Sequence, residues 1–206
     1  AQAYGARKFD KMNKYAGNSI TLAFVIGMVI MIVAHFLSRP LLKAIDTPDD
    51  IIDMSAQYID VLYYAVPIQM SLNNFNALSR AVGDSKRPLY FLIVSVIVNL
   101  LLDILFVGAF KWGVIGAAWA TAISELVAAV LSAISVLKHT EEYNIDKTAL
   151  KIDGKVSWAQ IKIGIPISLQ FSITSIGSMV LQTAVNGFGS SVIAGFTAAG
   201  RVEQLT

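Results

Sequence analysis

The stretch NSITLAFVIGMVIMIVAHFL, residues 18–37, contains no side chain that is fully charged at neutral pH. A membrane-spanning helix needs about 20 mostly apolar residues to cross a hydrocarbon core of about 30 Å. Three more blocks meet this requirement: 89–110 and 114–137, each with one acidic residue, and 163–188 with no charged residue. The sequence therefore predicts an all-α fold, a polytopic helix bundle in a membrane.

The composition agrees with a lipid environment. Charged residues make up 15% of the chain and hydrophobic residues 55%, whereas a soluble domain carries about a quarter charged residues. The chain has no cysteine and only two histidines, which lie far apart in sequence. We therefore expect no disulfide, no His- or Cys-based metal site and no cofactor. Without a nucleophile–base pair or a glycine-rich phosphate loop, we expect no enzyme activity.

A fifth block, residues 61–78, is uncharged but contains Pro67, Gln69 and three asparagines. It is too polar to face lipid on every side, so we expect it inside the bundle. Pro67 removes one backbone hydrogen bond and favours a kink. Residues 46–53 form an acidic stretch with a proline, which predicts a short helix outside the membrane. A sixth span begins near Val192 and is cut short at the end of the chain.

The distribution of basic residues predicts the orientation. Twelve of the sixteen Lys and Arg residues fall in one set of alternate loops, and cytoplasmic loops are enriched in these residues. We therefore place that set, which includes loop 83–88, in the cytoplasm. It also includes the longest polar segment, 138–162, predicted as a linker between two bundles that ends in an amphipathic surface helix around 156–161. The opposite set holds only Arg39, Lys43 and Lys111.

Both chain ends suggest a fragment of a longer protein. Ala1 is not an initiating methionine, no signal peptide precedes the first apolar block, and Thr206 lies in a segment that is still apolar.

Ionisable residues inside a membrane span are costly and are candidates for function. Counting from the short turn 111–113 at about 1.5 Å per residue predicts Asp103 level with Thr121, and Asn99 level with Glu125. Asn99 and Asp103 share a helix face because they are four residues apart. Such a layer can coordinate Na⁺ or exchange a proton; the alternative is that its side chains only join neighbouring helices by hydrogen bonds.

Several motifs resemble one transporter family, multidrug and toxic compound extrusion (MATE): residues 1–8, the loop ALSRAVGDSKRP at 77–88, Asn99 through Asp103 with Phe106, GVIGAAWAT at 113–121, and GIP at 164–166. The resemblance implies two six-helix bundles, of which this chain supplies the end of helix 2 to part of helix 8. Residues 1–137 then belong to the first bundle, 138–162 to the linker and 163–206 to the second bundle. It also implies export of drugs or other cationic or amphipathic molecules by alternating access, in exchange for Na⁺ or H⁺.

The resemblance is to the DinF-like branch, and it implies the site residues. The matching Asn and Asp of the fifth helix and Thr of the sixth belong to a cation-responsive site in that branch, which assigns cation or proton coupling to Asn99, Asp103 and Thr121. Na⁺ binding is possible at Asp103 and Asn99. Tyr58 matches a tyrosine of the same site. The NorM-like branch has a Glu on its seventh helix where this chain has Thr174, so coupling is expected in the first bundle.

Other polar residues have two interpretations. Glu125, Asn73 and Gln170 are candidates for an additional polar cavity. Asn73 and its neighbours Asn74 and Asn76 are otherwise expected to pack helices together. His35 is expected to be structural.

Two alternative functions remain at this point. One is a flippase for lipid-linked sugars from the same superfamily, which is disfavoured because the central charges of the spans are acidic. The other is a channel or a non-transporting membrane subunit. The expected partners are a small-molecule substrate and the lipid bilayer of the cell membrane, without nucleic acid, and the transporter is expected to be monomeric.

Overall fold

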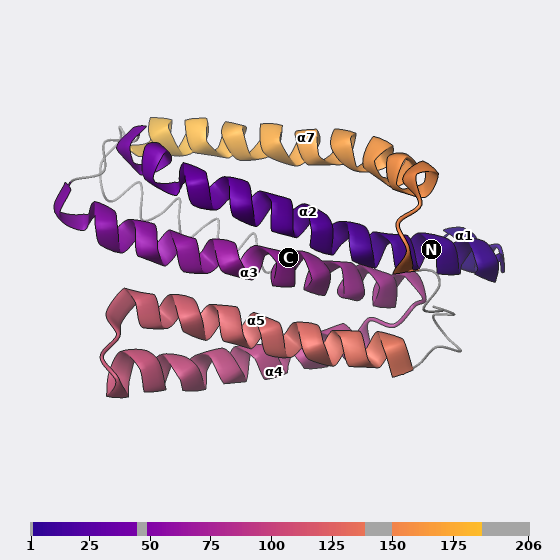
Figure 1. Ribbon diagram of the computed structural model, residues 1–206, viewed down its shortest axis with the longest axis horizontal. Coiled ribbons are helices and arrows are strands. Elements are labelled where there is room, and N and C mark those ends of the chain that lie inside the picture. Colours follow the sequence, from indigo (N-terminus) through magenta and orange to yellow (C-terminus); the bar gives the residue numbers. More distant parts are fainter. Residues whose placement is uncertain (1, 45–48, 139–149, 187–206) are drawn as a thin grey trace. The chain divides into compact units, whose positions relative to one another are not determined.

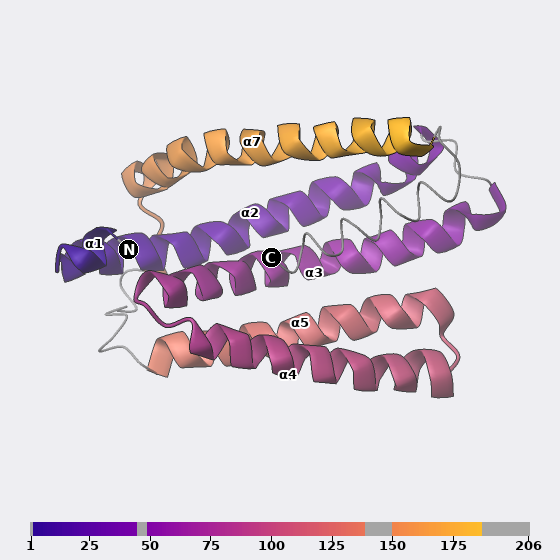
Figure 2. The same ribbon diagram turned by 180° about the vertical axis from the view of Figure 1, so that it is seen from behind.

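The computed structural model describes residues 2–44, 49–138 and 150–186. It divides into two compact units, residues 1–157 and 158–206. The described helices are α1 (Gln2–Gly5), α2 (Phe9–Ala44), α3 (Asp49–Ala81), α4 (Lys86–Asp103), the π-helix η1 (Ile104–Ala109), α5 (Gly113–Lys138) and α7 (Gly154–Asn186) (Figures 1 and 2). The first unit contains α1 to α5 and the first turn of α7; the second contains the rest of α7.

Four helices are long and apolar enough to cross a membrane, which confirms the four predicted spans. Their apolar segments cover Phe9–Lys43, Lys86–Ala109, Gly113–Lys138 and Gly154–Leu181. The described part of the chain contains no strand. The all-α membrane fold is therefore confirmed.

The polar helix α3 packs against α2 on one side and α5 on the other, as Figures 1 and 2 show. Its asparagines form hydrogen bonds in both directions: the side chain of Asn74 bonds Ser19 of α2 at 3.3 Å, and that of Asn76 bonds Ser132 of α5 at 3.4 Å. Such bonds between membrane helices contribute about 0.6 kcal/mol each. The prediction that this block lies within the bundle is confirmed.

The buried face of α5 is built almost entirely from small residues. Its buried positions are Gly116, Ala118, Ala120, Ala122, Ser124, Ala128, Ala129, Ser132, Ser135 and Val136. Small side chains let membrane helices approach closely, so that many weak van der Waals contacts form. This face explains how α5 packs against both α3 and α4.

The turn between η1 and α5 is closed by aromatic packing. The rings of Phe106 and Trp112 stack with centroids 5.0 Å apart, and the Trp112 N–H donates to the Phe106 carbonyl at 2.9 Å. A Cβ at Gly116 would lie 3.1 Å from the Phe106 Cβ, so this position favours glycine. Gly113 has a φ of +59°, which L side chains rarely adopt. The predicted tight turn at 111–113 is confirmed.

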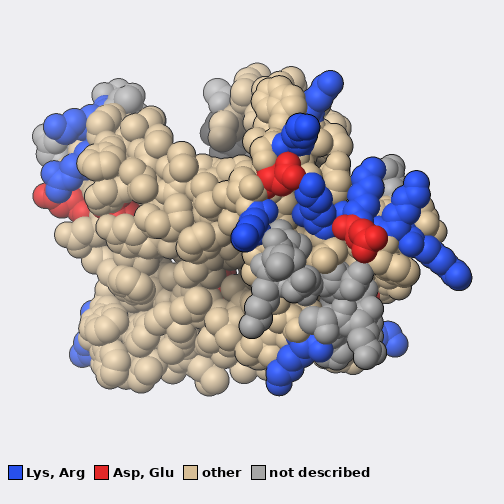
Figure 3. Space-filling model, turned by 45° about the vertical axis from the view of Figure 1, so that its right-hand side comes forward, with Lys and Arg blue, Asp and Glu red and all other residues tan. Residues whose placement is uncertain are grey.

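The loop at 83–88 caps the start of α4. The Asp84 Oδ1 accepts hydrogen bonds from the backbone N–H groups of Lys86 and Arg87, each at 3.1 Å. These are donors that a helix N-terminus leaves without partners. Exposed basic side chains lie in the turn after α1 (Arg7 and Lys8), in the first turns of α2 (Lys11 and Lys14) and in the loop 83–88 (Lys86), and in Figure 3 Lys and Arg gather around that end of the first unit. This is the end that we predict to be cytoplasmic.

Helix α7 differs from the prediction. We expected a separate surface helix around 156–161 and a span from Ile163, but one helix runs from Gly154 to Asn186 through Pro166. Proline interrupts only one backbone hydrogen bond, and the surrounding turns keep the helix continuous. Residues 139–149 of the predicted linker lie outside the described residues, as does the span expected from Val192.

The helix predicted at 46–53 also differs. Residues 45–48 lie outside the described part, and Asp49–Asp53 form the first turns of α3 rather than a separate element.

The close approach of α2 and α3 generates a stability prediction. A Cβ on Gly27 would lie 2.7 Å from the Pro67 Cα, so Gly27→Ala must push the helices apart. Overpacking of this kind costs about 1–3 kcal/mol. We expect a lower melting temperature for the full-length protein in detergent. Gly108→Ala is the control, because nothing lies within 4 Å of its Cβ position. Equal stability of the two variants would contradict the packing.

Candidate functional site

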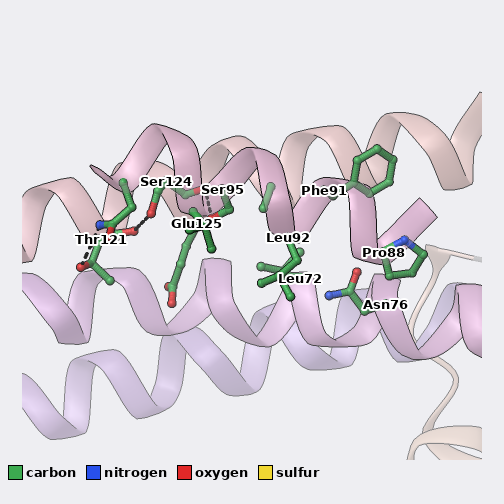
Figure 4. Close-up of a pocket in the computed structure, with 12 residues that line it drawn as sticks. Leu72, Asn76, Pro88, Phe91, Leu92, Ser95, Thr121, Ser124 and Glu125 are labelled. Carbon is green, nitrogen blue, oxygen red and sulfur yellow. Dashed lines mark hydrogen bonds between the residues drawn. The ribbon is translucent and has the colours of Figure 1, made fainter. Parts of the chain in front are cut away.

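A cavity of about 230 Å³ lies between α3, α4 and α5, within the first unit (Figure 4). Its walls combine apolar and polar side chains. The apolar ones are Leu72, Pro88, Phe91, Leu92, Val96 and Ala128, and the polar ones are Asn76, Ser95, Asn99, Thr121, Ser124 and Glu125. An apolar cavity with a few convergent polar groups is the usual form of a small-molecule site.

Glu125 is the one ionisable residue among those that line this cavity. Figure 4 shows its side chain reaching from α5 toward α3, where the Oε1 atom accepts a hydrogen bond of 3.1 Å from the Gln69 Nε2. One carboxylate oxygen is thereby held by an uncharged donor. The donor is uncharged, so this contact supplies no positive charge to pair with the Glu125 carboxyl.

Asn99 and Thr121 also meet at the cavity wall. The Asn99 Nδ2 lies 3.5 Å from the Thr121 Oγ1, a long hydrogen bond, and the Thr121 hydroxyl donates to the Ala117 carbonyl at 3.1 Å. One turn along α4, the Ser95 hydroxyl donates to the Ser124 carbonyl at 3.0 Å. The structure therefore brings Asn99, Thr121 and Glu125 into one cavity.

These contacts show that the predicted pairing of α4 and α5 residues at equal depth is wrong. Asn99 lies opposite Thr121 rather than opposite Glu125, a shift of about one helical turn. Part of this shift comes from η1, in which the Phe110 N–H bonds the Leu105 carbonyl, five residues back. A π-helix places more residues in each turn than an α-helix, so counting inward from the loop at 1.5 Å per residue misplaces α4.

Asp103 is the last residue of α4, directly before η1. It is one turn from Asn99 but does not line the cavity. Its Oδ1 atom is buried, and no described residue forms a hydrogen bond with it. A buried carboxylate oxygen without a partner is costly, and π-helical turns are frequent at functional sites. Both features make Asp103 a candidate for binding a cation or a proton.

Tyr58 lies on the same side of α3 as the contact with α5. It packs against the buried cluster of Val61, Ala65, Ala118 and Ala122. It is not part of the cavity wall. Its predicted role at the cation site stays a prediction.

Two other predicted residues lie away from this cavity. Asn73 is exposed on α3, and Gln170 is exposed on the part of α7 that belongs to the second unit. Asn76, which we expected only to pack helices, lines the cavity as well as bonding Ser132. The predicted role of Asn73 and Gln170 in a polar cavity stays a prediction.

Sequence reasoning named Gln69 only as part of a polar block, and it did not single out Ser95 or Ser124. Helical spacing contains the missing signal: Gln69 and Asn76 are seven residues apart, which is two turns along one helix face. Ser95 and Asn99, four residues apart, also share a helix face. Such a stripe of polar residues on an otherwise apolar helix indicates a buried polar surface.

Within the described ranges, no group of three or more His, Cys, Asp or Glu side chains could hold a metal ion. The candidate Na⁺ ligands are therefore one carboxylate with neutral oxygens, from Asp103, Asn99 and Thr121. Oxygen donors of this kind suit a hard, weakly held monovalent ion better than a structural transition metal.

Known proteins resemble this chain over nearly all its length. A Bacillus subtilis protein named "Probable multidrug resistance protein YoeA" is 30% identical over 210 residues, which cover 98% of this chain and 45% of the relative. The chain thus spans about half the length of the curated relatives that it matches.

Solved structures share the fold. An inward-facing multidrug resistance MATE transporter of the MOP superfamily superimposes with a TM-score of 0.80 at 25% identity, over 100% of this chain and 47% of its own. A MOP superfamily transporter from Pyrococcus furiosus, whose description reports a binding pocket of reversed polarity and suggests a different function, has a TM-score of 0.87 at 24% identity, over 98% and 45%.

The family model named MatE matches residues 1–105, which is more than half of the chain and contains α1 to α4 with Asn99 and Asp103. These matches agree with the spans and with the helix order described above. The protein therefore belongs to the MatE family and is a multi-pass protein of the cell membrane.

Proposed function

We propose that the full-length protein is a secondary active antiporter that exports cationic, amphipathic small molecules in exchange for Na⁺ or H⁺. The observation that carries this proposal is the single carboxylate, Glu125, in a cavity with mainly apolar walls. An organic cation with aromatic or aliphatic groups satisfies both features: its charge pairs with Glu125, and its apolar parts pack against residues such as Phe91 and Leu92.

The substrate class has to be inferred from the cavity rather than from the fold alone. A protein of the same fold is described as having a binding pocket of reversed polarity. The fold alone therefore does not fix the charge of the substrate. Among the described residues that line the cavity of this chain there is no Lys or Arg, which speaks against the pyrophosphate group of a lipid-linked sugar.

The coupling site in this proposal is the carboxylate of Asp103 with Asn99, Thr121 and, on α3, Tyr58. Asn99 now directs its amide nitrogen toward Thr121. A Na⁺ ion at Asp103 requires oxygen ligands, so its binding would draw the Asn99 Oδ1 and the Thr121 Oγ1 toward Asp103 and change the contact between these two side chains. Because Asn99 and Thr121 also line the cavity, such a change would alter the cavity wall.

A proton can act in the same way. Protonation converts the Asp103 carboxylate from an acceptor into a donor, which removes a buried charge and supplies a hydrogen bond to a neighbouring oxygen. Coupling in either case passes through Asn99 and Thr121, the two residues shared by the ion site and the cavity. Alternating access then requires an outward-opening state in addition to the inward-facing one described for a solved neighbour.

Transport itself is tested in cells that express the full-length protein. We expect them to extrude ethidium, a fluorescent aromatic cation, faster than cells without it. Absence of extrusion together with rescue of a flippase-deficient strain would instead favour transport of a lipid-linked sugar. Absence of both activities would favour a non-transporting membrane subunit.

The coupling role is tested with Asp103→Asn. This variant keeps the size of the side chain but can neither bind nor release a proton, and it removes the charge that attracts Na⁺. We expect normal expression, loss of cation-driven ethidium efflux, and loss of the melting-temperature shift that Na⁺ or low pH causes in the parent protein. Asp53→Asn is the control, because Asp53 is an exposed partner of Arg39. Unchanged efflux with the same pH and Na⁺ dependence would refute the assignment.

The substrate class is tested with Glu125→Gln. Glutamine can still accept the hydrogen bond from Gln69 but has no charge. Tetraphenylphosphonium has no hydrogen-bond donor, so its attraction to the Glu125 charge is Coulombic. Two unit charges roughly 4 Å apart attract by about 1–4 kcal/mol at dielectric constants between those of water and of a protein surface, so we expect binding of tetraphenylphosphonium to weaken about tenfold in isothermal titration calorimetry. Asn73→Ala serves as the control because Asn73 is exposed and outside the cavity. Equal affinity in parent and Glu125→Gln would exclude Glu125 from cation binding.

A further inference from the structure

A stripe of polar residues on α2 lies away from the cavity and has no part in the proposed function. It consists of Lys14, Asn18 and Thr21, spaced by four and three residues, so the three side chains share one helix face. All three contact the segment 150–157, which leads into α7. The Thr21 hydroxyl donates to the Leu150 carbonyl at 2.7 Å, and the Lys14 Nζ lies 2.7 Å from the Asp153 Oδ2.

Asn18 is the centre of this contact. Its side chain is completely buried, although it is polar and belongs to a membrane-spanning helix. The Oδ1 atom accepts the Asp153 backbone N–H at 2.8 Å, and the amide and the Ser157 hydroxyl exchange hydrogen bonds of 3.1 and 3.2 Å. Separating the two segments would leave these buried groups without partners, which is unfavourable in an apolar environment.

Asp153 joins this contact to the start of α7. Its Oδ1 accepts the backbone N–H groups of Lys155 and Val156, at 2.9 and 3.2 Å, which caps the helix. Its carbonyl accepts the Ser157 N–H at 2.8 Å. Each polar group of Asp153 is therefore engaged either with α2 or with the first turn of α7.

The surroundings of Asp153 also favour its charged, carboxylate form. The hydrogen bond from Lys14 lowers the pKa of this carboxyl below its ordinary value, with a further contribution from the cap at Val156. A lowered pKa means that the stabilising contact is present above the ordinary range of an aspartate and is lost only as the pH falls below it. The contact therefore persists at any cytoplasmic pH.

We propose that Asn18, Asp153 and Ser157 form an anchor that holds the first turn of α7 on α2 throughout the transport cycle, so that movement between the two bundles is absorbed within α7 beyond Ser157. This rests on the proposed alternating-access function. The boundary between the compact units falls after Ser157, inside a continuous helix. Pro166, about two and a half turns further on, lacks the N–H of one helical hydrogen bond and lowers the cost of bending there.

The anchor is tested by distances between spin labels in the full-length protein. One label replaces Asp10 at the start of α2, and its partner replaces either Lys155 in the first turn of α7 or Ser178 beyond Pro166; all three positions are exposed. Distances are measured by pulsed electron–electron double resonance with and without Na⁺, at high and low pH, and with tetraphenylphosphonium. We expect one narrow distance for Asp10–Lys155 under every condition, and a distance for Asp10–Ser178 that changes with them.

Variants and a cross-link separate the anchor from ordinary packing. Asn18→Leu keeps the branched shape of the side chain but removes its hydrogen bonds, so it should broaden the Asp10–Lys155 distance distribution. Ser38→Ala, in a buried serine that bonds only its own helix at His35, should not. This chain contributes no native cysteine, so a disulfide between Asn18→Cys and Ser157→Cys can be formed selectively. We expect the cross-linked transporter to keep at least half of its ethidium efflux rate.

Three results would overturn the proposal: an Asp10–Lys155 distance that changes with conditions, an Asp10–Ser178 distance that never changes, or efflux that stops on cross-linking and returns on reduction. A failure of the proposed function is distinct from these. It would appear as absence of efflux in the parent protein before any cross-link is formed, whereas the Asp10–Lys155 distance and its response to Asn18→Leu report on the anchor without transport.

Discussion

Hydrocarbon offers no hydrogen-bonding partner, and this constraint places α3 in the middle of the first unit. The helix carries more amide side chains than lipid can accept, so these groups must meet polar groups of other helices. Asn74 bonds α2, whereas Gln69 and Asn76 bond α5. The neighbours supply what α3 needs only because they approach closely, through Gly27 on α2 and a face of small residues on α5. The cavity is the space that remains where α4 completes this arrangement.

The same constraint explains why few residues of α4 are polar and why those few lie on the face that meets other helices. None of its residues is buried in the described unit, and most are aliphatic, as expected for a helix that faces lipid. Its three polar positions inside the span, Ser95, Asn99 and Asp103, are four residues apart and follow one face. Ser95 and Asn99 form hydrogen bonds with α5, whereas the Asp103 Oδ1 has no partner within the described part of the chain. Hydrogen bonds to α5 therefore hold the Ser95 end of this polar face, and the Asp103 end lacks such a bond at Oδ1.

Much of this arrangement was predictable from the sequence, because lipid requires spans to be long and uncharged and requires polar side chains to be enclosed by other helices. Long uncharged blocks set the spans of α2, α4, α5 and α7, and the amides in residues 61–78 indicated that α3 is enclosed. The register between α4 and α5 was not predictable, because nothing in Ile104–Ala109 distinguishes a π-helix from an α-helix by composition. Gln69 was missed as the partner of Glu125 for a different reason: the pairing depends on how two separate helices meet. The contact of Asn18 with Asp153 joins residues far apart in the chain and has the same cause.

The two membrane carboxylates differ in what satisfies them, and this difference is consistent with separate roles. Glu125 has a neutral donor, Gln69, and an open cavity beside it, so a bulky organic cation can reach its charge without displacing a helix. Asp103 does not line that cavity, and its buried Oδ1 has no hydrogen-bond donor among the described residues. In the proposed mechanism it holds the small coupling ion, Na⁺ or a proton. Between them, Asn99 and Thr121 contact each other across α4 and α5. In the proposed mechanism, a change of charge at Asp103 that moves Asn99 would alter the cavity wall near Glu125, and this link would couple the exchange of one cation to that of the other.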